Sequence, residues 1–365
     1  MSEPAKARKR PSVPAGRPFQ VALYGATGFT GRLAAQAMRD SDIETVLAGR
    51  DQEKLSAQAA DLGGLKYMVA GHGDTGALGR LAQSARVLVS CAGPFGEVGE
   101  LAVAAAVSAG CHYLDSTGES DFMAQTHRRH HRAAKEAGIT VINSFAFEYV
   151  LGDCAVELAL RRAREPVEVD VAYWVSDPTA SRGTVLSASR ILSSAAGRDN
   201  GEARRVHFPD PVGERWTMSY PGGEVELLRR RRPDLRVRTY MSVPPIVART
   251  AGLARGGTRL LGLPPLRAAI KQAVKRMPAG PDDEQRRQQR FVILVEVTTQ
   301  KGKMHRVRVD GVDAYGLTGV LLARGASWLL DGKARASGVL GPAEAFEPED
   351  LLDSLKPQAV TWSAA

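Results

Sequence analysis

A short apolar strand runs directly into three glycines spaced three residues apart. Residues 21–32 read VALYGATGFTGR, which places the glycines at positions 25, 28 and 31. In a strand–turn–helix unit, the first glycine permits the tight turn and the second lets a pyrophosphate approach the backbone. The third lets the helix pack on the strand, while free N–H groups at the helix start face the anion. The pattern predicts a dinucleotide site whose pyrophosphate-binding residues are Gly25, Thr27, Gly28, Phe29 and Thr30.

The residue after the second apolar strand favours one of the two nicotinamide dinucleotides. The strand Thr45–Ala48 ends in Gly49 and Arg50. At this point, roughly 20 residues after the glycines, an NAD-binding chain usually carries an acid for the ribose 2′-hydroxyl, whereas arginine suits a 2′-phosphate. We therefore expect NADP(H) as the cofactor, with the Arg50 guanidinium paired bidentately to the 2′-phosphate.

The first 150 residues alternate apolar strands with helical stretches. The predicted strands are Gln20–Tyr24, Thr45–Ala48, Lys66–Val69, Val87–Cys91, His112–Leu114 and Ile139–Ile142. The predicted helices are Thr30–Asp40, Asp51–Asp61, Asp74–Ser84, Gly99–Ala109 and Ser120–Ala137, with Asp51 and Asp74 as N-caps. This rhythm predicts an α/β fold over residues 19–150: a Rossmann-type, doubly wound parallel sheet that binds ligand beyond the carboxyl ends of its strands. Residues 1–18 are expected to form a disordered basic tail.

The rhythm changes after Gly152. Apolar residues alternate with polar ones in Val167–Val175, and a hairpin is expected where Phe291–Thr299 turns into Met304–Val309. Further strands are expected at Arg215–Tyr220 and Leu235–Val243. These patterns predict a second α+β domain over residues 151–314, built on an antiparallel sheet and assigned to substrate binding and dimerisation. Residues 315–365, beginning with an apolar helix, are expected to pack back on the first domain.

The loops that follow strands four to six hold the candidate chemistry. The run after the fourth strand is small and contains a proline; we expect it to line the nicotinamide, although it could equally be a plain turn. Its residues are Cys91, Ala92, Gly93, Pro94 and Phe95. Asp115 and Thr117 could point into the cleft, and Asp115 could instead fix a loop. Glu148 and Tyr149 lie at the domain junction, where either could exchange a proton or serve a structural hinge. With Arg182 of a facing loop, they are the candidate catalytic residues.

Composition and missing motifs exclude several classes of protein. Three cysteines without a CxxC spacing suggest neither a disulfide framework nor a metal site, and none is expected. His127, His130 and His131 lie among arginines and are expected to face solvent. No tyrosine is followed by lysine four residues on, and neither HExxH nor GxSxG occurs. No stretch reaches the roughly 18 apolar residues of a membrane span, so a cytoplasmic protein is expected.

The net charge of +9 is concentrated in one segment. Residues 235–281 contain nine lysines and arginines and no acid. Such a block could contact an anionic membrane surface, a CoA-linked substrate or an acidic carrier protein, or it could simply be solvated. Nucleic acid is not expected, because aromatic residues are not interleaved with the cations. Within the block, residues 244–277 could form a lid or a surface-lying amphipathic element, although an ordinary, partly exposed helical insertion is slightly favoured.

The chain resembles the saccharopine-dehydrogenase-like oxidoreductases, which include bacterial trans-acting enoyl reductases. The matching runs are GATGFTGR at 25–32, LAGR at 47–50, AGPF at 92–95, HYLDSTGE at 112–119, FEYVLGD at 147–153, SRGT at 181–184, YGLTGVLLARGA at 315–326 and GVLGPAEAF at 338–346. The resemblance implies NADP(H) dependence and, for the enoyl reductases, reduction of a carbon–carbon double bond in a lipid or polyketide chain. The family's usual Gly-Phe-Asp and following proline are replaced by residues 146–151 here, where substrate is expected to bind.

Two hypotheses follow. The first is an NADP(H)-dependent oxidoreductase that acts on an apolar, unsaturated small-molecule or carrier-linked substrate. No metal is expected for it, and any contact with an anionic membrane would be peripheral. The second is an NADP(H)-binding protein without turnover, which the basic segment recruits to a membrane or partner. A homodimer is compatible with either.

Overall fold

The computed structural model describes residues 16–177, 179–186, 203–254, 266, 272–274 and 276–365. Its first sheet has seven strands in the order β13-β6-β5-β4-β1-β2-β3, and every pair is parallel. The strands are β1 (Phe19–Tyr24), β2 (Thr45–Gly49), β3 (Lys66–Val69), β4 (Ala85–Ser90), β5 (His112–Asp115), β6 (Thr140–Ile142) and β13 (Gly338–Leu340). The predicted Rossmann-type sheet is confirmed, and β13 extends it by a strand from the far end of the chain.

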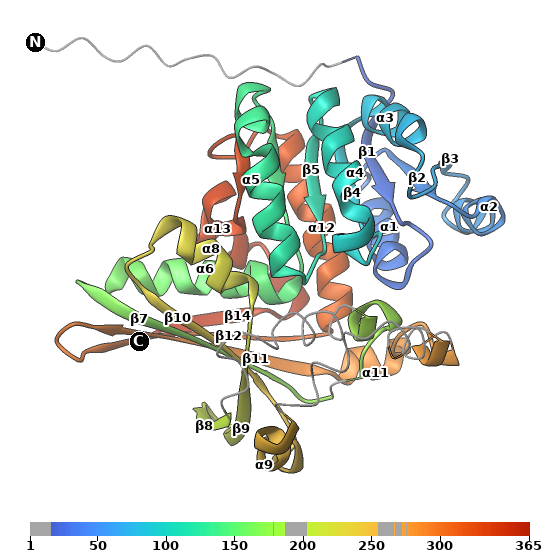
Figure 1. The fold of residues 1–365 in the computed structure, drawn as a ribbon. Coiled ribbons are helices and arrows are strands. Elements are labelled where there is room, and N and C mark those ends of the chain that lie inside the picture. Colours follow the sequence, from blue (N-terminus) through green and yellow to red (C-terminus); the bar gives the residue numbers. More distant parts are fainter. Residues whose placement is uncertain (1–15, 178, 187–202, 255–265, 267–271, 275) are drawn as a thin grey trace, which may run out of the picture.

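Helices cover both faces of this sheet (Figure 1). They are α1 (Phe29–Asp40), α2 (Gln52–Asp61), α3 (Thr75–Ser84), α4 (Phe95–Ala109), α5 (Ser120–Glu136) and α12 (Ala314–Leu330). Alternation along β1 explains the two layers. Leu23 belongs to the core shared with α1 and α12, whereas Tyr24 belongs to the core shared with α3, α4 and α5. The Asp51 and Asp74 side chains accept hydrogen bonds from Lys54 N (3.1 Å) and Ala77 N (2.8 Å), so both predicted N-caps are confirmed.

The second sheet also has seven strands, in the order β14-β12-β11-β7-β10-β9-β8. They are β7 (Pro166–Val175), β8 (Ala203–Phe208), β9 (Gly213–Tyr220), β10 (Arg236–Ser242), β11 (Arg290–Thr299), β12 (Met304–Val312) and β14 (Thr361–Ala364). The β11–β12 hairpin is confirmed. The prediction of an antiparallel second sheet is wrong for one pair of strands, because β10 runs parallel to β7. A parallel pair needs a long crossover, and residues 176–235 supply one.

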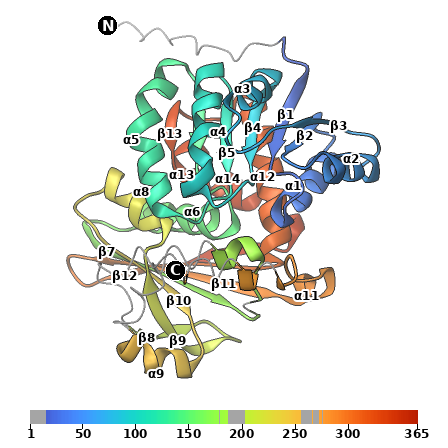
Figure 2. The ribbon, with the colours of Figure 1, turned by 45° about the vertical axis from the view of Figure 1, so that its right-hand side comes forward.

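A helix that the sequence patterns did not predict, α6 (Phe147–Arg162), lies between the two sheets (Figures 1 and 2). It packs on β11 and β12 and on the short helices α13 (Pro342–Ala345) and α14 (Pro348–Asp353). Because α6 is buried on most sides, its sequence lacks the one-sided apolar stripe of a surface helix. Its position makes the residues that follow β6 part of the boundary between the domains.

Asp153 ties α6 to its neighbours. Its side chain is fully buried, forms an ion pair with Arg231 of α8 (Gly223–Arg231) and accepts a hydrogen bond from Ala343 N at 2.9 Å. Burying a charged carboxylate is costly unless it is paired and hydrogen-bonded, and the cation and the backbone N–H meet both needs of Asp153. The last residue of the FEYVLGD run therefore connects α6 to both α8 and α13.

The remaining described elements are α9 (Pro245–Ala254), α11 (Asp283–Gln288) and the 3-10 helix Lys356–Gln358. The C-terminal segment serves both sheets: α12 and β13 pack with the first, and β14 pairs with β12 of the second. Among the described helices, none combines the length and the apolar character needed to cross a bilayer.

Candidate cofactor and active site

The glycine turn packs tightly against the loop after β4. Gly25 has a φ of +79°, and an added Cβ would lie 2.6 Å from Ala92 N. An added Cβ on Gly31 would overlap the Gly25 carbonyl oxygen and lie 2.8 Å from that of Ala26. These two positions therefore exclude any side chain, as the dinucleotide-binding pattern requires.

Gly31→Ala tests this packing. Alanine in an open helix position is more stable than glycine by about 1 kcal/mol, but here the added methyl must push the turn out of place. We expect the free energy of unfolding to fall by about 1–3 kcal/mol and NADPH affinity to fall with it, as measured by urea denaturation and fluorescence titration. Gly73→Ala is the control, because an added Cβ there meets nothing within 4 Å. Equal free energies of unfolding for the two variants would contradict the tight packing of Gly31 against the Gly25 and Ala26 carbonyl oxygens.

The start of α1 is suited to an anion. Its N-cap is Gly28, which is exposed and supplies no side-chain hydrogen bond, and its first turn contains no acid. The backbone N–H groups of the first turn are thus left for a ligand, and the helix dipole favours negative charge. Within the described chain, the residues present fit a dinucleotide pyrophosphate.

Phe29 is placed differently from its predicted role. Its ring packs edge-on against Tyr315 with 5.1 Å between the ring centroids, and it closely covers Gly280. The side chain therefore connects the glycine turn to the segment before α11, through Gly280, and to the first turn of α12, through Tyr315. Only its backbone N–H, in the first turn of α1, remains available for the pyrophosphate.

Arg50 lies where β2 reaches the carboxyl edge of the sheet. It is exposed and forms no ion pair with a residue in the described ranges. Tyr24 Oη and His72 Nδ1, at the ends of the flanking strands, lie 2.9 Å apart. Burial lowers the pKa of His72, and the nearby Arg50 charge lowers it further. This arrangement leaves the guanidinium free for a phosphate, as the NADP(H) prediction requires.

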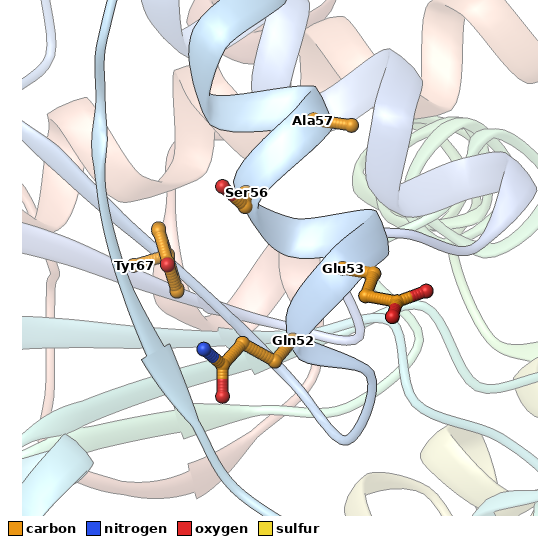
Figure 3. A pocket seen from close by; sticks show the side chains of 5 residues that line it. All are labelled: Gln52, Glu53, Ser56, Ala57 and Tyr67. Carbon is orange, nitrogen blue, oxygen red and sulfur yellow. The ribbon is translucent and has the colours of Figure 1, made fainter.

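A shallow hollow lies between α2 and β3, at the outer edge of the first sheet (Figure 3). Tyr67 of β3 faces the first turns of α2 across it, and the remaining lining residues are Gln52, Glu53, Ser56 and Ala57. Since this lining includes a carboxylate and no cation, the hollow is unsuited to the 2′-phosphate.

The loop after β4, predicted to line the nicotinamide, is shorter than predicted because helix α4 begins earlier. Helix α4 begins at Phe95, four residues before the predicted Gly99, because the Glu119 carboxylate accepts hydrogen bonds from Phe95 N (2.9 Å) and Gly96 N (3.1 Å). The Phe95 ring is buried against Phe122 rather than directed at a cofactor. Burial raises the pKa of the Cys91 thiol to about 12, so this thiol is neutral at pH 7.

What the loop after β4 offers a nicotinamide is therefore mainly backbone. Gly93 is exposed, Pro94 is partly buried and Ala92 is buried against Gly25. Cys91 N is engaged with Tyr24 O at 2.8 Å, which holds the end of β4 against β1.

Asp115 fixes a loop. It is fully buried and accepts hydrogen bonds from Ser144 N (2.8 Å), Thr117 N (3.0 Å) and Asn143 Nδ2 (2.7 Å). Burial raises its pKa to about 6 despite these donors. With its acceptor sites occupied in this way, the carboxylate joins the loops after β5 and β6 instead of reaching a ligand.

Glu148 and Tyr149 occupy the first turn of α6. Tyr149 is buried, its hydroxyl donates to Gly118 O at 3.3 Å, and its ring lies against Gly223. Glu148 is partly exposed, yet the loss of hydration raises the pKa of its carboxyl to about 7. A carboxylic acid that ionises near neutrality is suited to proton transfer, whereas Tyr149 is committed to packing.

Arg182 is not brought to these residues by any contact in the structure. Its exposed side chain donates from Nε to Met277 O at 2.6 Å, and its backbone N–H donates to Ala279 O at 3.1 Å. It thereby holds the segment that carries Gly280 against Phe29. The contacts assign Arg182 to a positioning role.

Comparison with known proteins identifies the first domain. Residues 21–142 match the family model described as the saccharopine dehydrogenase NADP binding domain. This range contains the glycine turn, Arg50 and the loop after β4. The chain is an NAD(P)-dependent oxidoreductase whose first domain is similar to the NADP binding domain of saccharopine dehydrogenase.

Relatives of this oxidoreductase extend the similarity over almost the whole chain. It is 28% identical over 414 residues to the trans-acting enoyl reductase of Mycobacterium ulcerans (strain Agy99), covering 96% of this chain and 98% of the relative. It is 27% identical over 399 residues to that of Mycobacterium bovis (strain BCG / Pasteur 1173P2), covering 91% and 94%. Saccharopine dehydrogenase (L-Glu forming) from Saccharomyces cerevisiae has the same fold, with a TM-score of 0.63 at 13% identity, over 95% of this chain and 100% of that one. The cofactor is accordingly NADP(H).

Three residues at the junction of the domains were missed by the sequence patterns: Tyr173, Tyr220 and Glu224. Tyr173 carried a signal, since it continues the alternating row of Val167, Val169 and Val171, of which Val169 and Val171 are buried, and a buried hydroxyl needs a partner. Glu224 carried none, because a carboxyl after two glycines is typical of an exposed turn.

The basic block of this oxidoreductase lies partly outside the described residues, which omit 255–265, 267–271 and 275. Of its described cations, Arg238 is paired with Asp170, with 2.8 Å between Nε and Oδ1. Residues 244–277, for which a lid was one of the alternatives, are described only in part, as α9 and a few residues beyond it.

Proposed function

We propose that this NADP(H)-dependent oxidoreductase reduces the carbon–carbon double bond of an enoyl group, with Glu148 as the proton donor. The observation that carries the proposal is the position of Glu148 in the first turn of α6, at the junction of the two domains, where burial raises the pKa of its carboxyl to about 7. Similarity to proteins named trans-acting enoyl reductases, over more than nine-tenths of the chain, supports the reaction type.

The chemistry requires one hydride and one proton. Bound NADPH supplies the hydride to the carbon remote from the acyl carbonyl. The adjacent carbon, which then carries the electron pair, needs a proton. Glu148 in its acid form can give that proton and regain one from solvent, because its side chain is partly exposed. The balance is one enoyl group, one NADPH and one proton converted to one saturated acyl group and one NADP⁺.

The proposed substrate class follows from the proposed reaction type. An apolar acyl chain, lipid or polyketide-like and bound as a thioester to CoA or a carrier, presents the conjugated carbonyl that makes this reduction feasible. Arg182 contributes by holding residues 277–280 in place, and Tyr149 by packing the first turn of α6 against α8.

A substrate panel tests the proposal. NADPH oxidation is followed by absorbance with enoyl thioesters of increasing chain length and with matched saturated aldehydes and ketones. Oxidation is expected with the enoyl thioesters only. Oxidation with the carbonyl compounds alone would reassign the reaction. No oxidation in any arm, with NADPH still bound, would favour a cofactor-binding protein without turnover, which the basic block could recruit to an anionic membrane.

A further inference from the structure

Behind Glu148, the structure brings two tyrosines and a second glutamate into one buried cluster. Tyr173 comes from β7, Tyr220 from the end of β9 and Glu224 from the first turn of α8. Tyr173 and Glu224 are almost fully buried, and the Tyr220 hydroxyl oxygen is also buried. The rings of Tyr173 and Tyr220 meet edge-on, with centroids 6.3 Å apart.

Tyr173 has one hydroxyl proton and two acceptors. Its oxygen lies 3.1 Å from the backbone carbonyl oxygen of Glu148 and within hydrogen-bond distance of Glu224 Oε1. A carbonyl oxygen can only accept a hydrogen bond, so Tyr173 must use its one hydroxyl proton to donate to the backbone carbonyl of Glu148. The contact with Glu224 is then a full hydrogen bond only if Glu224 supplies the second proton.

The surroundings of Glu224 also favour its neutral form. In the described part of the chain, no cation lies within ion-pair distance of it, and Oε2 has no hydrogen-bond partner. Arg231, on the same helix, is paired with Asp153 instead. An ionised carboxylate left in this state would be far more costly than a neutral acid. Burial accordingly raises the pKa of Glu224 to about 8.

Gly152 is shaped to allow this contact. An added Cβ at Gly152 would overlap both Tyr173 Oη and Glu224 Oε1. The glycine of the FEYVLGD run thus makes room for the two side chains to meet against α6.

We propose that Glu224 is a neutral carboxylic acid that donates a hydrogen bond to Tyr173, and that Tyr173 in turn holds the first turn of α6, which carries Glu148. Glu224 is thereby a positioning residue. When Glu224 ionises, it becomes an acceptor and draws the single Tyr173 proton away from the Glu148 carbonyl. The consequence for activity rests on the proposed role of Glu148, whereas the protonation of Glu224 does not.

Several titratable groups surround Glu224 and set the pH at which this change occurs. The groups that interact with Glu224 are Glu148, Tyr149 and Asp153 of α6, Tyr173 of β7 and Tyr220 of β9. The packed helices also carry His127 of α5 and the cations Arg230 and Arg231 of α8, of which Arg231 is paired with Asp153. The Asp153 and Glu148 charges act with burial to disfavour ionisation of Glu224.

Infrared spectroscopy and unfolding measurements test the protonation without any substrate. At about pH 7, the difference spectrum between the parent and Glu224→Gln should contain the C=O stretch of a protonated carboxylic acid. Because the folded state holds this proton more tightly than the unfolded state, the urea midpoint of the parent should fall from about pH 6 to about pH 9 more steeply than that of Glu224→Gln. Glu226→Gln, the same change on the same helix, is the control and should match the parent.

The activity arm uses the same variants. Above neutral pH, the logarithm of kcat for the parent should fall with a limiting slope of about −2, since Glu148 and Glu224 both ionise, and that of Glu224→Gln with a slope of about −1. The proposal would be overturned if the parent and Glu224→Gln had the same infrared band of a protonated carboxylic acid and the same pH dependence of the urea midpoint. If Glu224→Gln does not fold, Glu148→Gln carries the test: its acid band must persist at about pH 7 and disappear by about pH 10, and absence at pH 7 would refute it.

Discussion

Arg50→Asp is expected to weaken NADPH binding by roughly 100-fold while changing NADH binding by less than about threefold. A charge-assisted, bidentate arginine–phosphate pair is worth about 1.5–3 kcal/mol, and the introduced carboxylate adds repulsion against the 2′-phosphate. NADH lacks that phosphate, so it does not experience either effect. The measurement is the Kd of each cofactor by fluorescence titration.

Arg39→Asp is the matched control for Arg50→Asp. Arg39 is also exposed and lies in the last turn of α1, away from the helix start that faces the cofactor. Its replacement should leave both affinities unchanged. If the parent protein bound NADH and NADPH equally well, Arg50 would not be the 2′-phosphate ligand.

Glu148→Gln is expected to lower kcat by about 10²–10⁴-fold and to leave the Kd of NADPH unchanged. Glutamine preserves the size of the side chain but cannot release a proton. Because burial raises the pKa of Glu148 to about 7, the acid form is lost as the pH rises through neutrality, and the parent activity should fall there. The residual activity of Glu148→Gln should lack that fall.

Glu157→Gln separates loss of the acid from disturbance of α6. Glu157 lies on the same helix and its carboxylate is 3.5 Å from the Arg161 guanidinium near the surface. A surface ion pair contributes little, so kcat should change by less than about twofold. A Glu148→Gln enzyme with parental kcat would show that the proton comes from another group.

The first sheet could be predicted because its signals are local. Apolar runs of strand length, glycines at a sharp turn and aspartates at helix starts each act within a few residues, and β3 was predicted to the residue. Arg50, just after the second strand, predicted NADP(H), and the family resemblance carried by the same motifs implied the same cofactor.

The parts that escaped prediction depend on distant partners. Helix α6 is covered by the second sheet on one side and by α12, α13 and α14 on another, so it has no amphipathic stripe, and its FEYVLGD start gives no helical signal. Helix α4 begins early because of Glu119, which lies 24 residues away along the chain. The parallel pair of β7 and β10 depends on a crossover, and Glu224 acquires its role only when α8 packs on α6.

The most direct test of the central claim follows the transferred hydrogen. The protein is incubated with NADPH deuterated at C4 of the nicotinamide, each face in turn, and with an enoyl thioester. Mass spectrometry and NMR then locate the label. For one of the two faces, the account predicts one deuterium per NADPH consumed, on the carbon remote from the carbonyl of a saturated product. Deuterium on a carbinol carbon, or bound NADPH that transfers no label from either face, would contradict it.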